Sequence, residues 1–127
     1  MRRTNLWLLM AVLVLAACGA RSGNVGGGRR DVVTHEQLAA TNSTDLYRAL
    51  EKLRPEWLTS RGPTSIANAE PSQASVYMNG QHLGTVDYLR EIRVSDVQSV
   101  RYWAAGPAAA RFGMGHPRGV IEVIPQQ

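Results

Sequence analysis

Residues 96–124 (DVQSVRYWAAGPAAARFGMGHPRGVIEVI) include the clearest strand signal in this 127-residue chain. Residues 120–124 hold four β-branched side chains in five positions and predict a strand, and residues 100–103 predict another. Between them, Pro107 fixes φ at the start of a helical turn that contains residues 108–110. The stretch therefore predicts two strands joined through a helical turn.

A β-hairpin is predicted upstream of this stretch. Residues 75–78 are strand-like, Asn79 and Gly80 follow, and residues 81–83 continue the pattern. Asn-Gly between strand-like residues favours a type I′ turn, because that turn needs positive φ at both central positions. A further short strand is expected at residues 32–33.

Two helices are predicted in the first half of the domain. Thr34 and Gln37 have capping-box spacing, which predicts a brief helix directly after Thr34. A second helix should end near Leu53 or Arg54, because the residue before Pro55 disfavours helical geometry. This second helix is predicted from apolar residues at helical spacing, namely Leu46, Ala49, Leu50 and Leu53.

Further helical segments are expected nearer the C-terminus. Leu89 and Ile92 lie at helical spacing, and Ser95 with Gln98 forms another capping-box pair that predicts one helical turn. Residues 59–74, rich in Pro, Ser, Thr and Asn, are expected to form a long irregular loop. Strands alternating with short helices indicate an α+β domain with a mixed sheet.

The first 17 residues are predicted to be an export signal. Arg2 and Arg3 precede an uncharged apolar run over residues 6–17, which as a helix would span about 18 Å and is too short for a ~30 Å hydrocarbon core. The run ends in LAAC at residues 15–18, which resembles the lipobox of bacterial lipoproteins. That resemblance implies that Cys18 becomes the acylated first residue of the mature chain.

Two other interpretations of Cys18 remain open: a chance cysteine after an ordinary secretory signal, and a buried structural cysteine. In Gram-negative lipoproteins, Asp at the second mature position favours retention in the inner membrane; the resemblance to them therefore implies that Gly19 directs the protein to the outer membrane, facing the periplasm. Residues 18–30 then comprise the acylated cysteine and a Gly-rich tether that spans roughly 20 Å. The globular domain is expected over residues 31–127.

Charge and composition argue against several classes of function. The net charge is +4. Without Arg2 and Arg3 the chain has 12 basic and 10 acidic residues, which is too small an excess of positive charge to indicate a nucleic-acid partner. A single Cys permits no internal disulfide, and the three histidines lie far apart in sequence. Because no nucleophile elbow or phosphate loop is present either, we expect no catalytic activity, cofactor or metal site.

Four stretches in the second half of the chain form a recognisable series: residues 76–80 (VYMNG), 92–100 (IRVSDVQSV), 106–113 (GPAAARFG) and 119–124 (GVIEVI). The series resembles the plug domain of TonB-dependent outer-membrane receptors, and residues 33–38 (VTHEQL) resemble the start of that domain. It implies a small plug-like fold. Structural roles in turns or close backbone approach are expected for Asn79, Gly80, Gly106, Pro107, Gly113 and Gly119.

The chain departs from that family in two respects. A receptor continues from its plug into a 22-stranded barrel, whereas this sequence stops shortly after Ile124. The TonB box of the receptors is not recognisable in residues 19–30. We therefore expect a free-standing plug-like domain that performs no transport by itself.

The expected function is that of a non-catalytic, membrane-tethered interaction or accessory module. Its partner would be an outer-membrane barrel or a component of the TonB system. The alternatives are a periplasmic small-ligand or glycan-binding module that uses residues 61–74 and 114–118 as loops, and a structural relic of a receptor. The candidate binding residues are Arg61, Arg111, His116 and Arg118.

Overall fold

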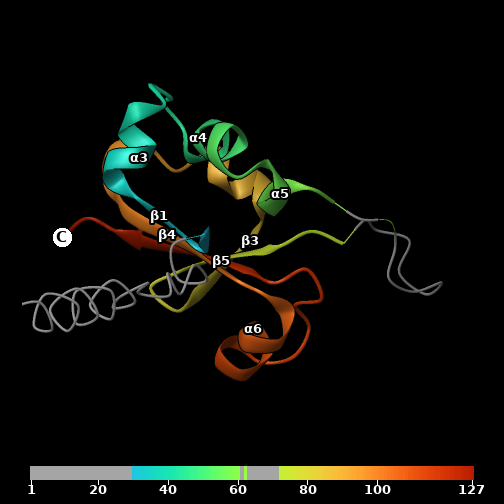
Figure 1. The fold of residues 1–127 in the computed structure, drawn as a ribbon. Coiled ribbons are helices and arrows are strands. Elements are labelled where there is room, and N and C mark those ends of the chain that lie inside the picture. Colours follow the sequence, from blue (N-terminus) through green and yellow to red (C-terminus); the bar gives the residue numbers. More distant parts are fainter. Residues whose placement is uncertain (1–29, 61, 63–71) are drawn as a thin grey trace, which may run out of the picture.

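A computed structural model describes residues 30–60, 62 and 72–127 of the chain. Five strands form one sheet in the order β1-β4-β5-β2-β3 (Figure 1). β5 runs parallel to β2, and the other neighbouring pairs are antiparallel. This mixed sheet with short helices confirms the α+β class. The strands are β1 (Val32–Thr34), β2 (Ser75–Met78), β3 (Gln81–Thr85), β4 (Val97–Trp103) and β5 (Val120–Pro125).

The side chains of the central strands alternate between two faces of the sheet. Val123 of β5 is paired with Val100 of β4, and Ile121 of β5 is paired with Val76 of β2. All four side chains are fully buried in the main hydrophobic core. We call their side of the sheet the core face. The opposite side, toward which Glu122 points because strand side chains alternate, is the outer face.

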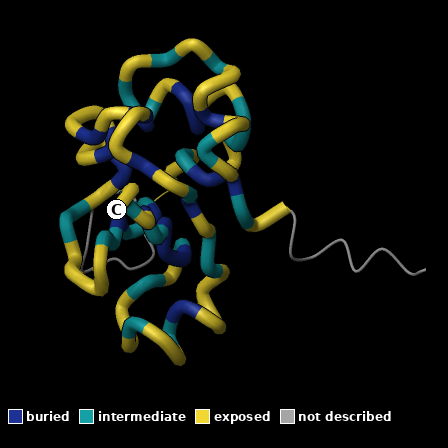
Figure 2. The backbone as a smooth tube through the Cα atoms, turned by 90° about the vertical axis from the view of Figure 1, so that its left-hand side faces the viewer, coloured by how far each residue is buried: buried dark blue, intermediate teal, exposed yellow. Residues whose placement is uncertain are grey.

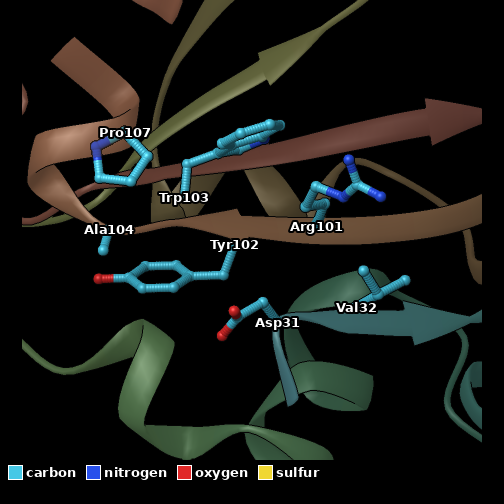
Figure 3. Close-up of a pocket in the computed structure, with 7 residues that line it drawn as sticks. All are labelled: Asp31, Val32, Arg101, Tyr102, Trp103, Ala104 and Pro107. Carbon is cyan, nitrogen blue, oxygen red and sulfur yellow. The ribbon is translucent and has the colours of Figure 1, made fainter. Parts of the chain in front are cut away.

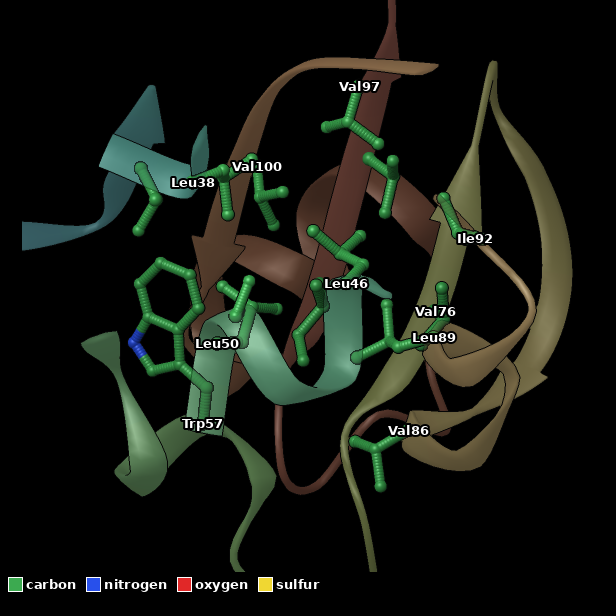
Figure 4. Packing of buried hydrophobic residues seen from close by; sticks show 14 of the residues in the cluster. Leu38, Leu46, Leu50, Trp57, Val76, Val86, Leu89, Ile92, Val97 and Val100 are labelled. Atoms are coloured by element: carbon green, nitrogen blue, oxygen red, sulfur yellow. The ribbon is translucent and has the colours of Figure 1, made fainter. Parts of the chain in front are cut away.

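Short helices cover the core face. They are α3 (His35–Ala40), α4 (Leu46–Leu53), α5 (Pro55–Leu58) and the 3₁₀ turn η2 (Val86–Arg90). Figure 1 shows α3, α4 and α5 together on one side of the sheet and α6 (Ala105–Phe112) on the other. Leu46 and Leu50 of α4 are fully buried among sheet valines, with Trp57 of α5 beside them (Figure 4). Figure 2 shows the buried residues as dark-blue segments that alternate with exposed ones along the chain.

Helix boundaries follow the local sequence signals. The Thr34 side chain accepts a bond from the Gln37 backbone N–H, and the Gln37 side chain accepts one from Thr34, so the predicted capping box is present. The Asp45 side chain caps α4 in the same way through Arg48 N. That helix ends at Leu53, as predicted, and Pro55 occupies the first turn of α5.

The Asn79–Gly80 turn confirms the hairpin prediction. Asn79 has φ 52° and Gly80 has φ 77°, so both central positions are left-handed, as a type I′ turn requires. The turn joins β2 to β3 in antiparallel register. Near the C-terminus, Pro107 lies in the first turn of α6, which extends beyond the predicted helical turn to residues 105–112.

Two local predictions are wrong. One helical turn is present at Ser95 as the 3₁₀ turn η3 (Val94–Asp96), but Ser95 and Gln98 form no capping box: η3 has no side-chain cap, and the Ser95 hydroxyl donates to Asp96. The turn ends there because β4, which contains Gln98, begins at Val97 and pairs with β5. Gly106 needs neither a turn conformation nor close backbone approach, because it is helical and a Cβ there would meet nothing within 4 Å.

The predicted export signal, the Cys18 lipidation site, the tether and Arg61 lie outside the described residues. Most of the loop predicted for residues 59–74 does so as well. Among the residues described, no helix is both long enough and apolar enough to cross a membrane.

Gly119 and Gly115 form a matched pair that tests close backbone approach. Both have positive φ (81° and 106°), but a Cβ at Gly119 would collide with the Trp103 carbonyl oxygen, whereas one at Gly115 meets open space. We expect Gly119→Ala to lower the free energy of unfolding by about 1–3 kcal/mol more than Gly115→Ala does, measured by urea denaturation. Equal losses would show that backbone conformation alone requires glycine at position 119.

Candidate functional site

The candidate site is a group of aromatic and charged side chains on the outer face. In the strand register, Glu122 of β5 is paired with Arg101 of β4 on one side and with Tyr77 of β2 on the other. Paired residues in a sheet point to the same face, so three neighbouring strands place these side chains together. We call them, with Trp103, Arg111 and Phe112, the outer-face cluster.

Glu122 connects the sheet to α6. Its Oε2 accepts a hydrogen bond of 2.8 Å from Trp103 Nε1, and its Oε1 accepts one of 3.0 Å from Arg111 Nη2. The Glu122 side chain is only 12% exposed, whereas that of Arg111 is 54% exposed. The carboxylate is therefore satisfied within the domain, while about half of the Arg111 side chain that neutralises it remains accessible to solvent.

The indole of Trp103 lies beneath two arginines. The Arg111 guanidinium carbon is 5.0 Å from the indole ring centroid, and that of Arg101 is 5.4 Å away. Both distances are within the range of cation–π attraction. Arg101 is exposed and has no ion-pair partner within the described residues. The cluster thus presents two guanidinium groups over an aromatic ring.

Phe112 joins the cluster from the last position of α6. Its ring centroid lies 4.6 Å from that of Tyr77 and 6.2 Å from that of Trp103. These spacings are typical of aromatic pairs. At the same end of the outer face, Ala108 of α6 and Val120 of β5 are fully buried. Phe112 therefore packs against the sheet, and α6 covers only part of the outer face.

His116 lies beside the cluster and is half-buried. Its Nδ1 is 2.9 Å from Ser75 Oγ, and its Nε2 is 3.2 Å from the Tyr77 hydroxyl. The His82 ring is 6.3 Å away, measured between centroids. Both ring nitrogens of His116 are within hydrogen-bond distance of hydroxyl groups of β2, so this histidine fastens the loop after α6 to the sheet.

The Arg118 side chain is bound to Thr59 and does not belong to the cluster. Its Nη2 donates to the backbone oxygen of Thr59, at 2.8 Å, and to the Thr59 hydroxyl, at 3.3 Å. Its backbone oxygen accepts a hydrogen bond from the Tyr102 hydroxyl. Of the four candidate binding residues, Arg111 is therefore in the cluster, His116 is adjacent to it, Arg118 is directed toward the end of α5, and Arg61 lies outside the described residues.

Two depressions flank the Trp103–Arg111 pair. One is lined by Asp31, Val32, Arg101, Tyr102, Trp103, Ala104 and Pro107. Figure 3 shows Arg101, Trp103 and Pro107 on one side of β4 and Tyr102 and Asp31 on the other. The second depression is lined by Tyr77, Asn79, Gly80, Arg111, Phe112 and Glu122. The first depression thus extends to both sides of β4, and the second is lined by side chains of the outer face and by the β2–β3 turn.

Within the described residues, no group of three or more His, Cys, Asp or Glu side chains could hold a metal ion. A scan against protein-family models and a search of curated proteins found no match to this chain.

Sequence reasoning missed Trp103, Glu122, Tyr77 and Arg101 as parts of the site. One signal was available. In residues 120–124, Glu122 is the single polar residue within an apolar strand, and period-two alternation places it opposite Ile121 and Val123. What alternation does not give is the pairing of β5 with both β2 and β4, because those contacts join residues far apart in the chain.

The Arg111–Glu122 ion pair should be energetically coupled. In a double-mutant cycle with Arg111→Gln and Glu122→Gln, we expect a coupling energy of about 1 kcal/mol, because the carboxylate is nearly buried and also accepts from Trp103. The matched control is Asp87–Arg90, a pair at 3.7 Å with both side chains more than half exposed, which should couple by less than about 0.5 kcal/mol. Urea denaturation measures both cycles. Coupling no larger than that of the control would contradict a structural role for the pair.

Proposed function

We propose that this chain is a lipid-anchored, non-catalytic module that binds another protein of the bacterial cell envelope, with an outer-membrane barrel or a TonB-system component as the candidate partner. The outer-face cluster carries the proposal. It combines Trp, Tyr, Phe and two Arg side chains, the residue types enriched at the energetic centres of protein interfaces. The hydrophobic core lies on the opposite face, so a partner could contact the cluster without disturbing that core.

The proposed anchor and tether would place the domain within reach of envelope partners. The lipobox-like sequence at residues 15–18 supports acylation of Cys18, and several acyl chains would hold the mature chain at the membrane. The Gly-rich residues 19–30 would let the domain stand off the bilayer by roughly 20 Å. Anchoring restricts the domain to the membrane surface. This raises its effective concentration near a partner in the same membrane.

The resemblance to receptor plugs supports the same class of function. A receptor plug contacts the wall of a barrel, which is another protein surface. The stretches that carry the resemblance include the Asn79–Gly80 turn, which is of type I′, and the glycines at positions 113 and 119, which have positive φ.

An envelope crosslinking pull-down with a C-terminal tag tests this proposal. The wild type should recover one barrel or energising protein, identified by mass spectrometry. Cys18→Ala should reduce that recovery by about tenfold or more, because the tether no longer holds the domain at the membrane. Trp103→Ala should also reduce it, provided that thermal unfolding shows a folded domain.

Tyr88→Ala is the matched control for Trp103→Ala. Tyr88 is an aromatic residue of η2 and is 37% exposed on the helical side of the domain, away from the outer face. Its replacement should leave recovery unchanged. Recovery of nothing above background, or equal losses for Trp103→Ala and Tyr88→Ala, would contradict the proposal.

A further inference from the structure

We propose that the outer-face cluster binds a partner segment that carries carboxylate side chains, with Arg101 as the main contact. This inference rests on the proposed function and names the chemistry of the partner at the same surface. The observation behind it is an imbalance of charge. The cluster holds two arginines, Arg101 and Arg111, and one carboxylate, Glu122, whose two oxygens are already taken by Trp103 and Arg111.

Arg101 is arranged to receive a ligand. Its guanidinium lies over the indole of Trp103, which limits the side chain's freedom and shields one side of it from water. The side chain is exposed and has no ion-pair partner within the described residues. Asp31 lines the same depression, but it lies on the other side of β4 (Figure 3). A guanidinium fixed in this way suits bidentate binding of a carboxylate.

Arg111 supplies a second point of contact. Its Nη2 is bound to Glu122, yet 54% of its side chain is exposed beside the second depression. Both guanidinium groups lie within 5.4 Å of the Trp103 ring centroid, so a segment with two carboxylates could contact both arginines over one indole. Glu122 would not repel such a segment strongly, because it is only 12% exposed and is neutralised by Arg111.

The charge pattern favours a protein partner over an anionic lipid surface. Recognition of anionic membranes through charge uses clusters of about four to eight basic residues. The outer-face cluster has two arginines, which flank aromatic rings. Two directional guanidinium groups beside an indole ring match a segment that offers carboxylates and an apolar side chain together.

Fluorescence anisotropy on the full chain in detergent micelles tests the inference. The probe is a short rhodamine-labelled peptide of alternating Glu and Leu at low salt, and its matched control is the same peptide with Gln in place of Glu. We expect the acidic peptide to bind at least about tenfold more tightly than the Gln peptide, and Arg101→Gln to remove about tenfold of that affinity. Arg101→Lys should retain part of it, because a lysine keeps the charge and loses the bidentate geometry.

Arg90→Gln is the charge-matched control variant. Arg90 also lies over an aromatic ring, 3.7 Å from the centroid of Tyr47, but it belongs to the helical side of the domain. It should change affinity by less than about twofold. Equal losses for Arg90→Gln and Arg101→Gln would overturn the inference, since they would indicate attraction by net charge alone. Equal binding of the two peptides would overturn it as well.

A vesicle arm separates the two sources of negative charge. If Arg101→Gln abolishes binding to phosphatidylglycerol vesicles and leaves peptide binding intact, the surface recognises lipid and the inference is wrong. Failure of the carboxylate inference is distinguishable from failure of the proposed function. A pull-down that recovers a partner in a Trp103-dependent way, together with peptides that do not discriminate, would overturn only the carboxylate chemistry. An empty pull-down would overturn the binding module itself.

Discussion

The pairing of β5 with β4 along one edge and with β2 along the other is the constraint on which the rest of the structure depends. β5 lies antiparallel to β4 and parallel to β2, so Ile121 and Val123 are fixed on the core face and Glu122 on the outer face. A slip of one residue would exchange the two faces and would bury a carboxylate among valines. The register that builds the core therefore also builds the outer-face cluster.

The two faces are held by different forces. Burial of aliphatic side chains beneath α3, α4, α5 and η2 stabilises the core face. The hydrophobic effect that favours this burial is non-directional, so it does not fix the orientation of individual groups. On the outer face, hydrogen bonds from Trp103 and Arg111 to Glu122 fix the orientation of particular polar groups. An interface needs that kind of order, because residues that already hold their bound geometry lose less entropy on binding. The main hydrophobic core and the proposed interaction surface thus lie on opposite faces of one sheet.

Local signals predicted the local structure, and long-range pairing set the remainder. The Thr34–Gln37 capping box, the end of α4 before Pro55 and the Asn79–Gly80 turn each involve residues within a few positions of one another. The Ser95–Gln98 signal is equally local, yet it is overruled because Gln98 lies in a strand held by β5. The cluster could not be predicted because Tyr77, Trp103 and Glu122 meet only through the sheet order.

Site-specific photo-crosslinking in living cells tests most directly whether the outer face is the docking surface. Ile124 of β5 and Tyr88 of η2 are each 37% exposed, one on the outer face and the other on the helical side. A benzophenone amino acid placed at position 124 should form an adduct of defined mass with one envelope protein, and the same group at position 88 should form none. An adduct from position 88 alone, or the same adduct from both positions, would contradict the assignment of binding to the outer face.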